Sequence, residues 1–123
     1  MTDRELLEKA AKAAGLAVII PAAHQRGLWI EGLEDEWNPL TDDGDALRLA
    51  VDLRMSILLR PLRVEVLSWP TKNAPIFYGF GGCVLPKVET IEPYEDNPHA
   101  ATRRAIVRAA AQIGEHMEKQ NGN

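Results

Sequence analysis

The chain of 123 residues is 46% hydrophobic and 26% charged, and its formal net charge is −4. This length predicts one domain, over residues 1–123, that buries a core without metal or disulfide staples. The composition excludes collagen, a bare coiled coil and wholesale disorder. The single cysteine, Cys83, excludes a disulfide scaffold and favours a reducing compartment. We find neither an apolar run of the ~18–20 residues that a membrane span needs nor a signal peptide, so we expect a cytoplasmic protein that does not bind membranes. The slight acidic excess argues against nucleic acid as a partner.

The N-terminal third predicts a helix followed by short strands. Thr2 and Glu5 have the spacing of a capping box, an apolar stripe follows at helical spacing, and Gly15 favours a left-handed C-cap. Residues 16–20 form a β-branched apolar run before a proline, which predicts a buried strand. Residues 28–30 indicate a second short strand, although no tight-turn dipeptide joins the two.

Residues 31–45 contain seven acidic side chains and no basic one. Pro39 disfavours helical geometry at the residue before it. We expect Thr41 to cap a helix that continues to about Met55, because the aspartates after Thr41 suit the positive end of a helix dipole.

The C-terminal half predicts a hairpin and a long helix. Residues 64–69 and 76–80 indicate two antiparallel strands, and residues 87–97 indicate a loop. Asn97 is a candidate cap for a helix that starts at Pro98 and frays at about 119–123. The expected fold class is therefore α+β: a small, mostly antiparallel β-sheet of 3–5 strands packed with N-terminal, middle and C-terminal helices.

The acidic segment is the first candidate site. Tryptophan is enriched among the residues that dominate protein interfaces, and the surrounding carboxylates would attract a basic partner. The candidate protein-binding residues are Glu34, Asp35, Glu36, Trp37, Asp42, Asp43 and Asp45. The alternative, that Trp37 folds back onto the core, stays open. The acids lack the spacing of a calcium-binding loop, so helix capping explains them better than a metal.

The second candidate site is the group Arg103, Arg104 and Arg108 in the last helix. Arginine grips phosphate through two parallel hydrogen bonds, so this group would suit a nucleotide or another small ligand. The same residues could instead pair with acids of the chain or of a second copy, and a homodimer stays open. No motif is specific to a reaction, which favours a non-catalytic protein without a cofactor or metal.

Two segments, residues 37–51 and 96–111, resemble small proteins of temperate bacteriophages and prophages. In looser form they resemble the phage ABA sandwich domain and NinX-like proteins, in which a Trp/Pro/Asp turn leads into a middle helix. The resemblance implies a small α/β sandwich inside an infected bacterium and carries no catalytic residue over. It implies an accessory protein that binds a host protein, such as a defence component, or a phage protein.

Overall fold

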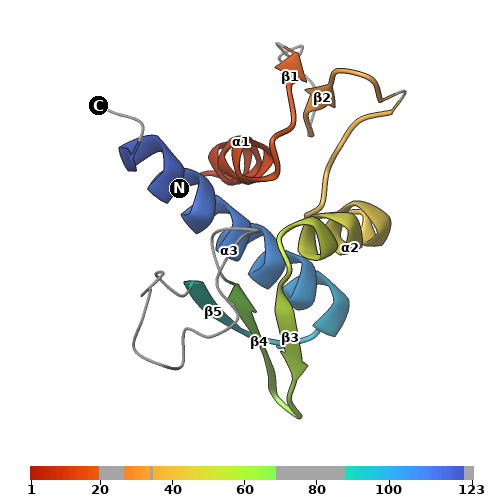
Figure 1. The fold of residues 1–123 in the computed structure, drawn as a ribbon. Helices are drawn as coiled ribbons and strands as arrows, with labels where there is room; N and C mark the ends of the chain where they lie inside the picture. The colour runs from red at the N-terminus through yellow and green to blue at the C-terminus, as the bar shows by residue number, and fades with distance from the viewer. Residues whose placement is uncertain (20–26, 34, 69–87, 121–123) are drawn as a thin grey trace.

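The computed structural model describes residues 1–19, 27–33, 35–68 and 88–120 (Figure 1). Its elements are α1 (Asp3–Ala14), β1 (Val18–Ile19), β2 (Trp29–Ile30), α2 (Asp43–Asp52), β3 (Ser56–Leu59), β4 (Arg63–Ser68), β5 (Val88–Pro93) and α3 (Pro98–Gln120). Three helices and two small antiparallel sheets confirm the expected α+β class. The expected strand at 76–80, Glu34 and Cys83 lie outside the described residues.

The helix starts and stops follow from local chemistry. The Thr2 hydroxyl accepts a hydrogen bond from the Glu5 N–H, and Gly15 has the left-handed φ of 74° that lets the chain leave α1. At α3, the Asn97 side chain accepts from the Ala100 N–H at 3.0 Å. These three caps confirm the sequence interpretation, because a cap depends on residues within one turn.

The helix α3 runs through the middle of the molecule, with the larger sheet on one side and α1 on the other (Figure 1). The sheet has the order β3-β4-β5, and Val66 pairs with Ile57 on one side and with Thr90 on the other. Alternate residues of β4, from Val64 to Ser68, are buried. Thr90 is also buried and donates to the Ala105 carbonyl at 2.7 Å, which ties β5 to α3.

Four sequence expectations need correction. Residues 88–93 form a strand, not a loop, because Val88 and Thr90 are buried while Glu89 and Ile91 are exposed. The run around β1 is not a buried strand, since its side chains are 38% and 51% exposed. The N-cap of α2 is Asp42, not Thr41, and α2 ends at Asp52 rather than near Met55. Asp42 has the extended backbone of a cap, and its carboxylate accepts from the Asp45 N–H at 2.8 Å.

The packing of α1 against α3 depends on small residues. Gly114 of α3 lies against the backbone of Lys9, and a Cβ at this glycine would be 2.0 Å from the Lys9 carbonyl oxygen. Alanines on both helices are buried around this crossing, including Ala10, Ala11 and Ala110. The crossing is therefore close enough that a methyl group does not fit at its centre.

Candidate functional site

A backbone bridge fixes the middle of the acidic segment. Leu28 and Trp37 exchange two backbone hydrogen bonds, of 2.9 and 2.7 Å, and form an isolated antiparallel bridge. The indole of Trp37 belongs to the hydrophobic core, with 4% of the residue exposed. Trp37 therefore folds back onto the core, which was the alternative left open by the sequence. The exposed surface is formed by the carboxylates around it.

Asp45 holds the turn before α2 against the first turn of the helix. Its Oδ2 accepts from the Asn38 N–H at 3.0 Å, and its Oδ1 accepts from Arg48 Nη2 at 2.8 Å. The side chain of Asp45 is 12% exposed, whereas that of Arg48 is 70% exposed. A nearly buried carboxylate is thus neutralised by a guanidinium that reaches it from solvent.

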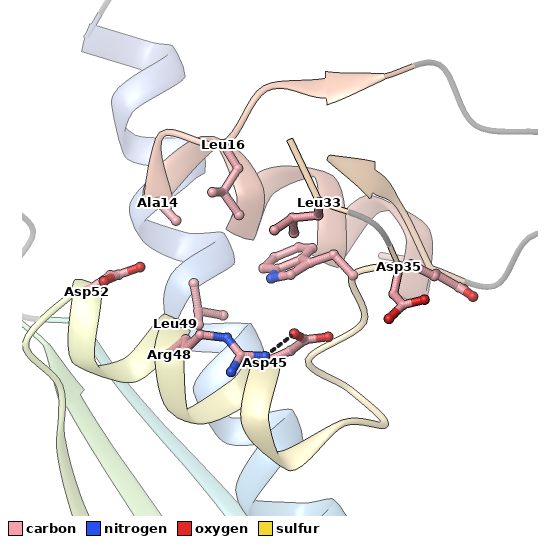
Figure 2. Close-up of a pocket in the computed structure, with 10 residues that line it drawn as sticks. Ala14, Leu16, Leu33, Asp35, Asp45, Arg48, Leu49 and Asp52 are labelled. Carbon is pink, nitrogen blue, oxygen red and sulfur yellow. Dashed lines mark hydrogen bonds and ion pairs between the residues drawn. The ribbon is translucent and has the colours of Figure 1, made fainter. Parts of the chain in front are cut away.

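A pocket of about 310 Å³ lies between the end of α1, residues 33 and 35–37, and α2. We call it the acidic groove (Figure 2). Its apolar wall is formed by Ala14, Leu16, Leu33, Trp37 and Leu49. Its polar residues are Asp35, Glu36, Asp45, Arg48 and Asp52.

A second hollow of about 470 Å³ continues the acidic groove toward the N-terminus of α2. The two hollows share Asp35, Glu36, Asp45 and Arg48, and the second adds Asp42 among the charged residues. Among the residues that the structure describes, together they are lined by five carboxylates and one guanidinium. This balance favours a cationic ligand, and the apolar wall favours one with an aliphatic part.

The structure brings most of the predicted acidic residues together but separates one of them. Asp43 forms an ion pair of 2.5 Å with Arg103, which joins α2 to α3. Asp43 does not line the acidic groove. Glu36 lines the groove, and its carboxylate accepts from the Gly27 N–H. Glu34 lies outside the described residues.

Sequence reasoning missed six residues that line this pocket: Ala14, Leu16, Leu33, Arg48, Leu49 and Asp52. Three of them follow Asp45 on α2 at spacings of three, four and seven residues, which places them on one helix face. That spacing was readable in the sequence. Nothing local indicated, however, that this face borders a hollow instead of solvent.

The three arginines of α3 are directed to three different elements. Arg103 pairs with Asp43 of α2 and also donates to the Leu40 carbonyl at 2.9 Å. Arg104 pairs with Asp3 of α1. Arg108 pairs with Glu92 of β5. Each guanidinium therefore already binds a carboxylate within the chain, and the three do not converge on one anion.

The comparisons with known proteins give no relative. No family model matches the chain, and neither a curated protein nor a solved structure matches it significantly. The resemblance to phage proteins accordingly stays a prediction from sequence. Within the described ranges, no three His, Cys, Asp or Glu side chains are close enough together to hold a metal ion. None of the described helices is long and apolar enough to cross a membrane.

Proposed function

We propose that this chain is a non-catalytic binding protein that takes a basic segment of a partner protein on the acidic groove and its continuation. The observation that carries the proposal is the combination, in the described part of the chain, of an apolar wall with five carboxylates and a single guanidinium. An apolar wall provides contact area, and an excess of one charge selects the partner by attraction and by repulsion of acidic competitors.

The phage setting belongs to the same proposal and rests on the sequence resemblance alone. In that setting the partner is a host protein, such as a defence component, or a phage protein, inside the bacterial cytoplasm. A basic partner surface is the requirement that the acidic groove itself imposes on either candidate.

The proposal is tested with a labelled octapeptide of alternating leucine and arginine residues, in a fluorescence anisotropy titration. We expect it to bind, and we expect an octapeptide of alternating leucine and glutamate not to bind. Raising the salt from about 50 mM to about 300 mM should weaken binding, because exposed charges are screened. Absence of binding to the basic peptide would contradict the proposal.

Charge reversal then locates the surface. Asp35 and Asp52 are exposed and have no hydrogen bond or ion pair with the described residues, so the double variant Asp35→Lys, Asp52→Lys should fold normally. We expect it to bind the basic peptide at least about tenfold more weakly, a loss of about 1.4 kcal/mol. The matched control, Glu89→Lys with Glu95→Lys, changes the net charge equally at β5 and the loop after it. Equal weakening by both variants would contradict the proposal.

A further inference from the structure

Asp45 lies where the two hollows meet, since it lines both of them. It is the most buried carboxylate of the acidic groove, with 9% of the residue exposed. One of its oxygens is committed to the Asn38 backbone N–H, and the other accepts from the chain's own Arg48. The carboxylate at this junction therefore already binds a guanidinium.

The ion pair between Asp45 and Arg48 is suited to exchange. Arg48 reaches Asp45 from the helix surface, its side chain is 70% exposed, and the only partner given by the described residues is this one carboxylate. Ion pairs with an exposed partner contribute little to stability, because water and salt compete for the cation. Displacing Arg48 costs little provided that another cation replaces it, since an unpaired buried carboxylate is strongly unfavourable.

The walls around Asp45 specify the shape of the replacing group. Leu49 and Trp37 are mostly buried and line the hollow only with their edges, but Leu33, which is 48% exposed, adds apolar surface to the same pocket, and this wall suits a chain of methylenes. A guanidinium fits the terminal position better than an ammonium. It is more weakly hydrated, and its planar fork donates two parallel hydrogen bonds to one carboxylate.

We propose that the acidic groove takes an arginine side chain of the partner segment, which binds Asp45 in the place of Arg48. This inference rests on the proposed function, because it assumes a basic partner segment at the acidic groove. Arg48 then acts as an internal competitor: it neutralises Asp45 in the free protein and moves to solvent when the partner arginine enters.

The test uses three blocked hexapeptides that share two lysines and a leucine and differ at one position, which is arginine, lysine or the neutral arginine isostere citrulline. We expect the arginine peptide to bind about tenfold more tightly than the citrulline peptide and more tightly than the lysine peptide, in line with the strength of charge-assisted hydrogen bonds. Equal binding of all three peptides would overturn the inference. Equally tight binding of free arginine amide would overturn the partner segment as occupant.

Two variants test whether Arg48 and Asp45 cause the preference for the arginine peptide. Arg48→Ala removes the competitor from an exposed position, so the arginine peptide should bind several-fold more tightly. Asp45→Asn keeps an acceptor for the Asn38 N–H but removes the charge, so the preference for arginine over citrulline should disappear. If Arg48→Ala weakens binding instead, Arg48 is a contact residue and the inference is wrong, whether or not Asp45→Asn folds.

The charge-reversal variant separates this inference from the proposed function. The three peptides could bind equally, with Asp35→Lys plus Asp52→Lys weakening the binding of all three. That result would support a basic partner at the acidic groove and would contradict the exchange of Arg48 for a partner arginine. If that variant binds all three peptides like the unchanged protein, both proposals fall.

Discussion

At the residue scale, Gly114 and Gly44 are helical glycines with opposite expected responses to alanine. Alanine usually stabilises a helix relative to glycine. At Gly114 the added Cβ would meet the Lys9 backbone at 2.0 Å, so Gly114→Ala should destabilise the protein by about 2–3 kcal/mol. At Gly44 the nearest atoms are the ends of two side chains, at 3.2 Å or more, so Gly44→Ala should be neutral or mildly stabilising. Urea denaturation of both variants checks the contrast, and equal effects would contradict the close helix crossing.

Trp37 gives a second prediction at this scale. Because its side chain is buried in the core, Trp37→Ala should lower the free energy of unfolding by about 3–5 kcal/mol. Domains of this kind are stable by about 5–15 kcal/mol, so this variant reports on folding before it reports on binding. Thermal denaturation followed by circular dichroism measures the loss. A melting temperature equal to that of the unchanged protein would contradict the burial of Trp37.

At the element scale, the start of α2 distinguishes two neighbouring cap candidates. Asp42 accepts from the Asp45 N–H, whereas the Thr41 hydroxyl contacts the Asn38 carbonyl at 3.4 Å. Asp42→Ala should therefore cost about 1 kcal/mol, and Thr41→Ala only a few tenths. Chemical denaturation of the two variants decides between them. A larger loss for Thr41→Ala would restore the cap that the sequence pattern suggested.

The ion pair between α1 and α3 predicts a pH dependence. A hydrogen bond of 2.9 Å from Lys9 lowers the pKa of Glu118 below its ordinary value of 4.5. A carboxylate whose pKa is lower in the folded state stabilises that state above its unfolded pKa, and this contribution is lost as the pH falls through the folded pKa. Glu118→Gln should thus be less stable than the unchanged protein at neutral pH, and the difference should shrink as the pH falls below 4.5. A difference that persists unchanged at low pH would contradict this origin, and Glu89→Gln serves as the exposed control.

At the scale of the whole molecule, the sequence predicted what depends on neighbouring residues. The caps at Thr2, Gly15 and Asn97 each involve one turn of chain, and the three helices follow from apolar periodicity. Strand β5 was missed because a segment with a proline and many charges has the composition of a loop. Its burial pattern depends on β4 and α3, which are distant in sequence.

The acidic groove was predictable only in part, for the same reason. The carboxylates of residues 35–45 were visible as an unbalanced charge run. Trp37 is buried, and Arg48 lies against Asp45, because of the way α2 packs near α1 and near residues 33 and 35–37. No local sequence pattern specifies this packing. The functional consequence, an apolar wall beside the acids, appears only when these three segments are assembled (Figure 2).

The most direct test of the central claim is to map the bound peptide on the protein. Backbone amide shifts of the isotope-labelled chain should be recorded during titration with the arginine hexapeptide. We expect the largest shifts at residues 35–38 and 45–52, and only small shifts in β5 and in the second half of α3. Shifts concentrated on β5 and the loop after it, or on the outer face of the larger sheet, would contradict the acidic groove as the binding surface.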